Sequence, residues 1–509
     1  MPYTASLIAA AVLAAALAGC QPADGPATLS RAGEPLAGTH PFGSIDFAPC
    51  SLTSAEGGTA TEAHCGQLEV AEDPAHPDGR RISLNIAWLQ PSNAGAPDPV
   101  FFLAGGPGQA ATAHAAAVKR MLSAVGKQRD IILVDQRGTG RSHPLDCRGP
   151  DGAPLPLDVM AEQSQADTLT YTRQCLQGLE GRADPRFYTT TDAVRDLDAV
   201  RAALGVEKIN LVGVSYGTRV AQQYAARYPA HTRSVVLDGV APNELVVGGE
   251  FATTVEDALG LQSAQCRQIE ACAKRYPVDM REQLRTVMQT LRQSPVEVDY
   301  RDSRTNQARH GTITADAVGS LAFMFSYLPQ TASLLPLTID EAAHGRYAPL
   351  MSLVQMSSDQ MQGQINRGMN WSVVCAEDAG RYVPAPGAAD TIMGSGLSEA
   401  FFAPCAQWPR GEVPADFHRP FTSEVPVLLL SGELDPVTPP RYGEQVAAHL
   451  PNARHLVLKG QGHNVAFVGC MPKLLGQFVE TADAKALDAT CLDNLSYVPP
   501  FVNFNGWSP

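Results

Sequence analysis

The chain has 509 residues, of which 44% are hydrophobic and 18% charged, and its formal net charge at pH 7 is −14. This length and apolar content suffice for one large α/β domain with an insertion, or for two domains. The excess of acidic residues argues against a nucleic-acid partner and favours a soluble, self-repelling surface.

The first twenty residues predict an export signal. Residues 7–18 form an alanine-rich apolar run that is too short for an ordinary transmembrane helix. The run ends in Leu-Ala-Gly-Cys, which resembles a bacterial lipobox, so we expect residues 1–19 to be removed and Cys20 to be lipidated. No Lys or Arg precedes the run, and a plain secretory signal cut nearby is the alternative. Gln21, in place of an aspartate, indicates anchoring in the outer membrane, as in similar Gram-negative lipoproteins.

Ten further cysteines agree with export. They form no Cys-x-x-Cys motif and no Cys/His spacing typical of zinc, so we expect disulfides and no metal site. Connectivity does not follow from the sequence, but one hypothesis pairs the cysteines in sequence order. The pair with the shortest loop, Cys266 and Cys272, supports it best. The other pairs would be Cys50–Cys65, Cys147–Cys175, Cys375–Cys405 and Cys470–Cys491.

The next part of the chain predicts a mostly parallel, doubly wound sheet. Residues 20–45 are rich in Pro, Gly, Ala and Thr and predict a flexible tether. Alternating apolar and polar residues then predict two early antiparallel strands, and buried strands follow that alternate with helical segments. The predicted strands are 66–70, 82–89, 99–104, 130–135, 209–212 and 234–240, and the predicted helices are 110–125, 192–204 (with Thr191 or Asp192 as N-cap) and 218–227.

The centre of this pattern is Gly-Val-Ser-Tyr-Gly at residues 213–217. It matches G-x-S-x-G and lies between a predicted strand and a predicted helix, the context in which a tight turn exposes a nucleophilic serine. An ordinary strand-to-helix turn is the alternative. We therefore expect Ser215 to be the nucleophile of a hydrolytic enzyme.

From residue 241 to 421 the pattern changes. Helical stretches dominate at 256–275, 281–293 and 315–333, and residues 347–370 look less regular. We expect a mainly helical cap inserted into the sheet domain, with an independent second domain as the alternative. The chain then returns to a buried strand at 425–430, a helix at 441–449 and a last strand at 453–458. The sheet domain would thus comprise residues 46–240 and 422–509.

A serine hydroxyl needs an imidazole to take its proton and a carboxylate to orient that imidazole. Downstream of Ser215, the last two predicted strands end in loops that bear Asp435 and His463, in the order Ser, acid, His that this motif requires. The competing acids are Glu433 and Asp238. The competing bases, His449 and His455, lie on a helix and at the start of a strand.

Two backbone N–H groups are needed to bind the tetrahedral oxyanion. We expect one from Tyr216, directly after the nucleophile, and one from Gly106 in the Gly-Gly-Pro-Gly loop at 105–108. Pro107 has no N–H to donate. A plain turn is the alternative reading of the glycine run.

Six segments together make a family resemblance specific. They resemble the α/β-hydrolase peptidases of the proline iminopeptidase and tripeptidyl aminopeptidase clan, and most closely the tripeptidyl aminopeptidase-like branch. The likeness spans about residues 80–480, with the cap least specific. The segments are Gly-Gly-Pro-Gly (105–108), Asp-Gln-Arg-Gly-Thr-Gly-Arg-Ser (135–142), the serine motif, Trp-Ser-Val-Val-Cys-Ala-Glu (371–377), Gly-Glu-Leu-Asp-Pro-Val-Thr (432–438) and Gly-His (462–463).

The resemblance implies an α/β-hydrolase fold and cleavage of short peptides from a free N-terminus, without a cofactor. Such an enzyme needs an anionic group for the substrate ammonium. Glu377 and Asp378 follow a strand-like run at 371–375 in the cap region and are our candidates, with a solvated acidic pair as the alternative. We expect Arg137 and Arg141 to brace the loop beside the oxyanion glycines and the Thr438 hydroxyl to support the Asp435 loop.

Two other functions remain open at this point. An esterase or lipase on the same triad would need a large apolar acyl pocket, which the cap could supply. A non-catalytic envelope protein that uses the fold for binding would need a broken triad, whereas Ser215, Asp435 and His463 are all present.

Overall fold

The computed structural model describes residues 38–508 apart from 55–59, 94, 156–163 and 362. The predicted signal peptide, Cys20 and the first part of the predicted tether lie outside the described residues. The last part of that tether is structured, because two strands begin at His40 and Ile45. Among the described residues, no helix is long and apolar enough to cross a membrane.

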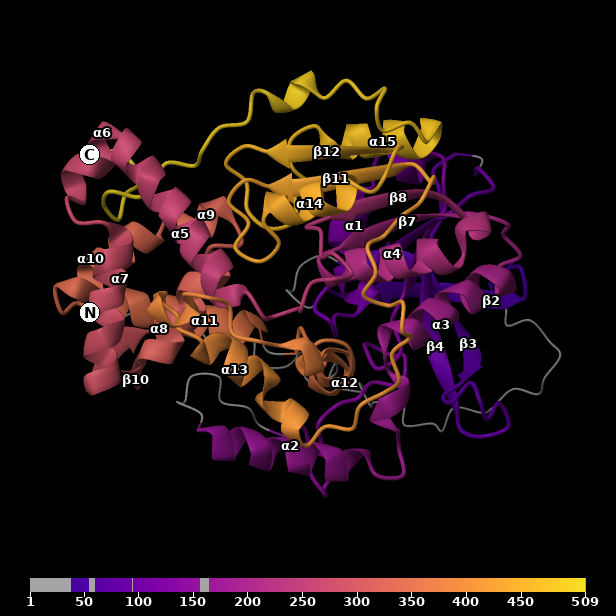
Figure 1. Ribbon diagram of the computed structural model, residues 1–509, viewed down its shortest axis with the longest axis horizontal. Helices are drawn as coiled ribbons and strands as arrows, with labels where there is room; N and C mark the ends of the chain where they lie inside the picture. The colour runs from indigo at the N-terminus through magenta and orange to yellow at the C-terminus, as the bar shows by residue number, and fades with distance from the viewer. Residues whose placement is uncertain (1–37, 55–59, 94, 156–163, 362, 509) are drawn as a thin grey trace, which may run out of the picture. The chain divides into compact units, whose positions relative to one another are not determined.

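Ten strands form one sheet in the order β1-β2-β3-β4-β6-β5-β7-β8-β11-β12 (Figure 1). β1 to β4 and β6 pair antiparallel, whereas β6, β5, β7, β8, β11 and β12 run parallel to one another. The bounds are β1 (His40–Phe42), β2 (Ile45–Leu52), β3 (Thr61–Ala71), β4 (Arg81–Leu89), β5 (Val100–Leu103), β6 (Ile131–Val134), β7 (Ile209–Val214), β8 (Thr232–Asp238), β11 (Val427–Gly432) and β12 (Ala453–Leu458). The structure thereby confirms the predicted doubly wound α/β sheet.

The parallel strands are mostly apolar because both faces of the sheet are covered. Side chains alternate between two cores: Phe101 and Leu211 face one, and Phe102 and Val212 face the other. α3 and α4 pack on the first face, and α1 and α15 pack on the second. The helices of the sheet domain are α1 (Ala115–Met121), α2 (Gln165–Leu179), α3 (Thr190–Ala203), α4 (Tyr216–Arg227), α14 (Pro440–Ala447) and α15 (Met471–Thr481).

The segment between β8 and β11 builds a cap with a core of its own, lined by side chains such as Leu284, Val318 and Leu350. β8 and β11 are neighbours in the sheet, so this segment is an insertion rather than an appended domain. Its elements are α5 (Phe251–Gln268), α6 (Glu270–Arg275), α7 (Met280–Gln293), β9 (Val296–Arg301), β10 (Ala308–Ile313), α8 (Ala315–Phe325), α9 (Pro329–Ala332), α10 (Leu335–Ala343), α11 (Ala348–Met361), α12 (Arg367–Glu377) and α13 (Gly396–Phe402).

Three local predictions in the cap are wrong. The segment predicted to be irregular contains α11, and the strand-like run at 371–375 lies inside α12. β9 and β10 form an antiparallel hairpin that the helical reading of the cap missed. In α12 the β-branched residues Val373 and Val374 suggested a strand, but packing into the core decides the conformation.

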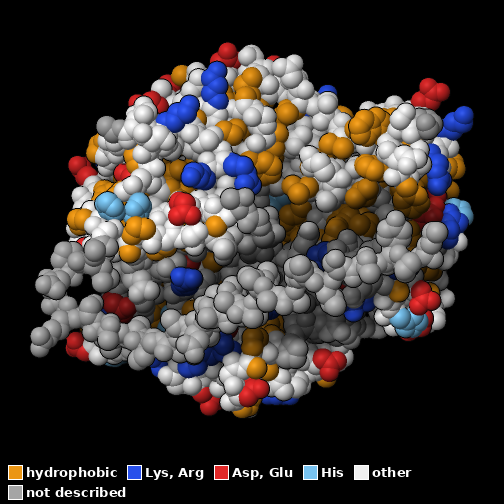
Figure 2. Space-filling view, turned by 180° about the vertical axis from the view of Figure 1, so that it is seen from behind, with side chains coloured by type: hydrophobic (Ala, Val, Ile, Leu, Met, Phe, Trp, Pro, Cys, Tyr) orange, Lys and Arg blue, Asp and Glu red, His pale blue; other side chains and the backbone are white. Residues whose placement is uncertain are grey.

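Five disulfides join the ten described cysteines in sequence order: Cys50–Cys65, Cys147–Cys175, Cys266–Cys272, Cys375–Cys405 and Cys470–Cys491. Cys375–Cys405 ties α12 to the segment that follows α13. On the face shown in Figure 2, charged side chains of both signs are interspersed with hydrophobic ones. Such a mixed surface fits the ordinary composition of the chain.

Candidate active site

Ser215 stands on a strained turn between β7 and α4. Its backbone has φ 56° and ψ −125°, values that a non-glycine residue rarely adopts. A side chain at Gly213 would come within 2.4 Å of the Gly217 carbonyl oxygen, and one at Gly217 within 2.2 Å of the Leu103 carbonyl oxygen. Both glycines of the motif are therefore required by close backbone approach, and the turn has the geometry of a nucleophile elbow.

Asp435 and His463 follow β11 and β12, two adjacent parallel strands whose carboxyl ends lie at the same edge of the sheet. Asp435 Oδ2 lies 2.8 Å from His463 Nδ1. The N–H groups of Val437 and Thr438 each donate to Asp435 Oδ1 over 2.8 Å. The Thr438 hydroxyl donates to Asp435 Oδ2 over 2.9 Å and lies 3.1 Å from His463 Nδ1. Thr438 thus supports the acid loop and also touches the imidazole.

The carboxylate and the imidazole favour each other's charged form. Burial alone would raise the pKa of Asp435, but His463 and the hydrogen bonds to the carboxylate outweigh it and hold that pKa below its usual value. Burial alone would lower the pKa of His463, but Asp435 outweighs it, and the pKa of this imidazole lies above 6.5. Asp435 is thus a carboxylate that can stabilise an imidazolium at His463.

Asp238 links the serine turn to the histidine loop. Its backbone oxygen accepts a hydrogen bond from the Ser215 N–H over 2.8 Å, and its carboxylate accepts bonds from the Val465 and Ala466 N–H groups over 2.8–2.9 Å. A side chain added at the next residue, Gly239, would lie 3.0 Å from His463 Cε1. Ser215 and His463 therefore both adjoin the short segment formed by Asp238 and Gly239.

Three of the four competing acids and bases are engaged elsewhere: Glu433, Asp238 and His455. Glu433 accepts hydrogen bonds from the Gly460 N–H and the Tyr497 hydroxyl. His455 is hydrogen-bonded to Ser431 Oγ. The Asp238 carboxylate is occupied by two backbone N–H groups, and its burial raises its pKa to about 6. Asp435 is thus the carboxylate that contacts the His463 ring.

The Gly-Gly-Pro-Gly loop after β5 lies against the serine. A side chain at Gly105 would be 3.1 Å from Ser215 Cβ, and Gly106 has φ 110°. Tyr216 is the first residue of α4, so its N–H lies at the positive end of the helix. The N–H groups of Gly106 and Tyr216 therefore come from two segments that both adjoin Ser215, as binding of an oxyanion requires.

Comparisons with known proteins agree with this geometry. A model of the α/β-hydrolase fold matches residues 98–258, and a model of TAP-like proteins matches residues 390–491. The chain is thus similar to α/β-hydrolases over residues 98–258 and to TAP-like proteins over residues 390–491. Both matched segments contain parts of the site, since Ser215 lies in the first and Asp435 and His463 lie in the second.

Several peptidases are similar to this α/β-hydrolase. The serine protease Hip1 of Mycobacterium tuberculosis is 26% identical over 452 residues, 84% of this chain and 86% of the relative. The tripeptidyl aminopeptidase of Streptomyces lividans is 32% identical over 212 residues, 38% of each chain. The solved proline iminopeptidase of Mycobacterium smegmatis is 18% identical, with a TM-score of 0.42 over 83% of this chain and 100% of that chain.

The structure contradicts the expectation that Glu377 and Asp378 meet the substrate amine. Only 2% of Glu377 and 0% of Asp378 is exposed. Asp378 forms an ion pair with Arg219 at 2.9 Å, and Glu377 accepts hydrogen bonds from the Thr190 N–H and hydroxyl over 2.7 and 2.9 Å. Burial raises the pKa of Glu377 to about 8. Both acids form contacts inside the protein, because a buried carboxyl group needs hydrogen-bond or ion-pair partners.

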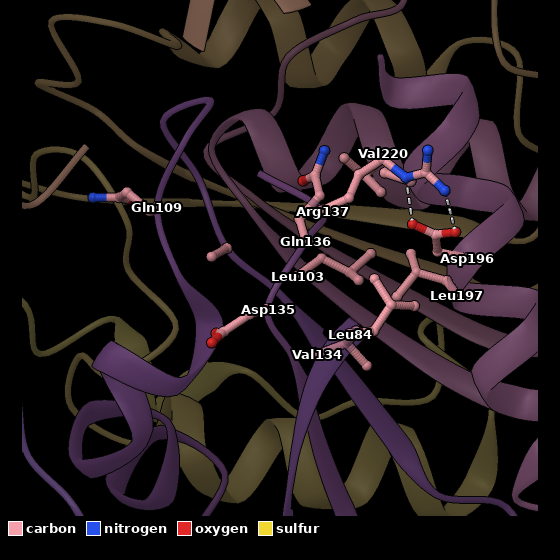
Figure 3. A pocket seen from close by; sticks show the side chains of 12 residues that line it. Leu84, Leu103, Gln109, Val134, Asp135, Gln136, Arg137, Asp196, Leu197 and Val220 are labelled. Carbon is pink, nitrogen blue, oxygen red and sulfur yellow. Dashed lines mark hydrogen bonds and ion pairs between the residues drawn. The ribbon is translucent and has the colours of Figure 1, made fainter. Parts of the chain in front are cut away.

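A small pocket adjoins the Gly-Gly-Pro-Gly loop, since the flanking residues Ala104 and Gln109 line it together with core side chains, Gln136 and Arg137 (Figure 3). Its lining includes neither Ser215 nor His463. The Arg137 guanidinium binds both oxygens of Asp196 at 2.6 Å and donates to backbone carbonyls such as Phe187 O. Arg137 therefore fixes the loop that begins at Asp135. At Arg141, the backbone N–H also binds Asp135.

Sequence reasoning missed two asparagines that touch the oxyanion loop. The Asn370 side chain donates to the Pro107 carbonyl over 3.0 Å, and the Asn366 N–H donates to the Gly108 carbonyl over 2.8 Å. The segment was expected to be irregular, so no pattern indicated that a helix would place them here. Among the described residues, no group of three or more His, Cys, Asp and Glu residues could hold a metal ion.

Proposed function

We propose that this chain is a serine exopeptidase that removes short peptides from free N-termini through an acyl-enzyme. Ser215 is the nucleophile, His463 the general base and then acid, and Asp435 the residue that orients His463. The N–H groups of Gly106 and Tyr216 bind the oxyanion. The observation that carries this proposal is the contact of His463 with Asp435 beside the strained turn of Ser215.

The chemistry follows from these positions. Ser215 Oγ attacks the scissile carbonyl carbon while His463 Nε2 takes its proton, and the carbonyl oxygen becomes an oxyanion between the two N–H groups. The carbon–nitrogen bond then breaks, and His463 gives the proton to the departing amine. Water attacks the acyl-enzyme with His463 again as base, and the short N-terminal peptide leaves.

The position of the cap supports action on chain ends. The backbone N–H of His463 donates to the Tyr327 carbonyl of the cap over 2.7 Å. The backbone N–H of Asn366, at the start of α12, donates to the Gly108 carbonyl. The cap segment therefore contacts the site on its histidine side and on its oxyanion side. A roof of this kind restricts entry to slender substrates such as peptide ends. The names of the tripeptidyl aminopeptidase and proline iminopeptidase relatives agree with such substrates.

An ester is the second candidate substrate, because aromatic rings follow one another from the histidine into the cap. The Tyr327 ring lies 5.1 Å from the His463 ring, and the Phe323 and Phe251 rings continue the row at 5.4 and 5.3 Å. This apolar surface would suit an acyl chain as well as an apolar peptide side chain.

Matched peptide anilides with free and with acetylated N-termini would separate the candidates, beside a short-chain nitrophenyl ester and with Ser215→Ala as the blank. We expect turnover of the free-amine peptides, which acetylation abolishes. Ester turnover without peptide cleavage would refute the exopeptidase and leave the triad intact. If Ser215→Ala matched the wild type, the triad itself would be wrong.

We also propose that the protein is exported and held at the outer membrane by a lipid on Cys20. The five disulfides support export, because disulfides persist in oxidising compartments. Metabolic labelling with a fatty acid should tag the wild type and not Cys20→Ala. Equal labelling of both proteins would contradict the lipid site.

A further inference from the structure

The first turn of α12 packs against the loop that carries one proposed oxyanion donor. Besides the bonds to the Pro107 and Gly108 carbonyls, a side chain at Gly108 would come within 2.6 Å of the Asn366 carbonyl oxygen. The loop and the helix are thus in backbone contact on both sides of Pro107. Asn370 is buried, so its bond to the Pro107 carbonyl is shielded from water.

The last turn of α12 reaches the second proposed donor through a chain of hydrogen bonds. Glu377 accepts from the Thr190 hydroxyl over 2.9 Å, and that hydroxyl lies 2.6 Å from the Tyr216 hydroxyl. Gln136 Nε2 donates to the Tyr216 hydroxyl over 3.2 Å. The Thr190 hydroxyl therefore contacts both Glu377 and the Tyr216 hydroxyl. The side chain of Tyr216, the residue of the second proposed donor, is thereby held at its hydroxyl from two directions.

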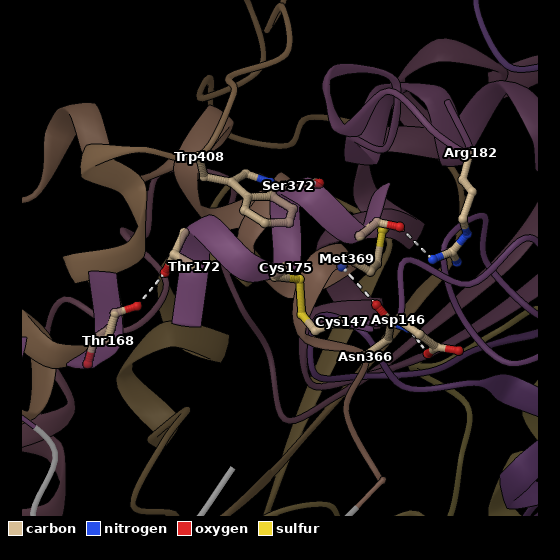
Figure 4. Close-up of a disulfide and its surroundings, with 11 residues drawn as sticks. Asp146, Cys147, Thr168, Thr172, Cys175, Arg182, Asn366, Met369, Ser372 and Trp408 are labelled. Carbon is tan, nitrogen blue, oxygen red and sulfur yellow. Dashed lines mark hydrogen bonds between the residues drawn. A yellow bond between two sulfur atoms is a disulfide. The ribbon is translucent and has the colours of Figure 1, made fainter. Parts of the chain in front are cut away.

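Separate contacts anchor α12 to the rest of the molecule. At its start, Asn366 Oδ1 caps the helix by accepting from the Met369 N–H, while Asn366 Nδ2 donates to Asp146 beside the Cys147–Cys175 disulfide (Figure 4). At its end, the neighbouring Asp378 is paired with Arg219. Both ends of the helix are therefore tied to the sheet domain.

We propose that α12 is a brace that sets the separation of the two oxyanion donors, with Asn370 and Glu377 as positioning residues. This inference rests on the proposed function, because it takes Gly106 and Tyr216 as the donors. Seven residues of α-helix span about 10 Å and form a rigid spacer. Rate depends steeply on the placement of the donors, since a shift of about 1 Å can cost 10²-fold. The brace acts on the transition state rather than on substrate binding.

The test compares three removals of a buried polar group with one conservative change. Asn370→Ala removes the bond to the Pro107 carbonyl, and Thr190→Val breaks the chain to Tyr216, whereas Thr190→Ser keeps the hydroxyl. Ser372→Ala is the matched control, because Ser372 is buried in α12 but accepts a hydrogen bond from Trp408 Nε1 over 3.0 Å rather than bonding to Pro107 or Thr190. Figure 4 shows Ser372 and Trp408. The readouts are kcat and KM for 4-nitrophenyl acetate and the Ki of phenylboronic acid, which forms a tetrahedral adduct on the serine.

We expect Asn370→Ala and Thr190→Val to lower kcat about 10- to 100-fold with KM unchanged. The Ki of phenylboronic acid should rise by a similar factor. Thr190→Ser and Ser372→Ala should stay within about twofold of the wild type. Unchanged kcat in both disrupted variants would overturn the brace. An equal loss in Ser372→Ala, or lower kcat with undiminished boronate binding, would do the same.

Two controls keep the outcome decisive. If Asn370→Ala does not fold, as judged by near-ultraviolet circular dichroism, the comparison of Thr190→Val with Thr190→Ser decides. Ester turnover by Ser215→Ala would overturn the triad and the brace together. If the wild type cleaves the ester but not the free-amine peptides, the exopeptidase proposal alone is refuted. The ester kinetics of the variants would then still test the role of α12.

Discussion

Two clusters of buried acids lie close to the serine turn, and they differ in whether the partner of the acid can exchange a proton. Asp435 is paired with His463, whose imidazole can take up and release a proton. Asp378 and Glu377 are paired with Arg219, one turn along α4 from Ser215, and with Thr190. A guanidinium does not give up its proton at ordinary pH. Burial and charge pairing thus mark both clusters, but only a partner that can lose and regain a proton makes one of them suitable for catalysis.

The largest expected effect is a loss of catalytic rate when the acid of the first cluster, Asp435, is changed. Asp435→Asn keeps the shape of the acid but removes the charge that stabilises the imidazolium, and kcat/KM should fall about 10⁴-fold. Turnover of the ester substrate measures it. A loss below tenfold would contradict the role given to Asp435.

The same variant has a pH signature. The general base must be neutral, and Asp435 holds the pKa of His463 above 6.5, so wild-type kcat/KM should fall as the pH drops through a value above 6.5. Without the Asp435 charge, burial lowers the pKa of His463, and the acid limb of the residual activity should move to lower pH. An acid limb at the same pH in both proteins would mean that another group controls it.

The second largest effect should be on stability. Arg219→Met leaves Asp378 buried without its cation, and the free energy of unfolding should fall by about 3–5 kcal/mol. Denaturant unfolding measures it. Arg195→Met is the control, because Arg195 is half exposed and its pair with Asp192 should contribute at most about 1 kcal/mol. Equal losses in the two variants would remove the distinction between the buried cluster and a surface pair.

The sequence predicted which loops lie together wherever strand ends determine their position. Ser215, Asp435 and His463 each follow a buried apolar strand, and adjacent parallel strands bring their carboxyl-end loops to one edge of the sheet. The apolar runs and the glycine motifs therefore carry enough information to predict which loops meet.

The cap was harder to predict because its contacts are not local. Nothing in the neighbourhood of Glu377 indicates that Thr190 and Arg219 will surround it, since both come from distant parts of the chain. α12 was missed for a related reason: Val373 and Val374 favour a strand, and only packing into the main core overrides them. The acids of this segment were expected to meet the substrate amine, whereas they are buried and paired with Arg219 and Thr190.

A smaller effect on rate should show how much the hydrogen bond from Thr438 to Asp435 contributes to activity. Thr438→Val removes the hydroxyl that donates to Asp435 Oδ2, and one hydrogen bond to a charged group corresponds to about a tenfold loss in kcat/KM. Thr438→Ser keeps the donor and should retain most of the activity. Equal activity of the Val and Ser variants would show that the hydroxyl is dispensable.

The smallest effect concerns the pH dependence of stability at Glu377. Burial raises the pKa of Glu377 from 4.5 to about 8 in the folded protein. Between these values the unfolded chain releases a proton that the folded protein keeps, so the contribution of Glu377 to stability falls as the pH rises. Glu377→Gln lacks this proton, and its Tm relative to the wild type should therefore increase from pH 5 to pH 8. A constant difference in Tm would mean that Glu377 is already ionised at pH 5. Both clusters would then hold ionised carboxylates, and this difference between them would disappear.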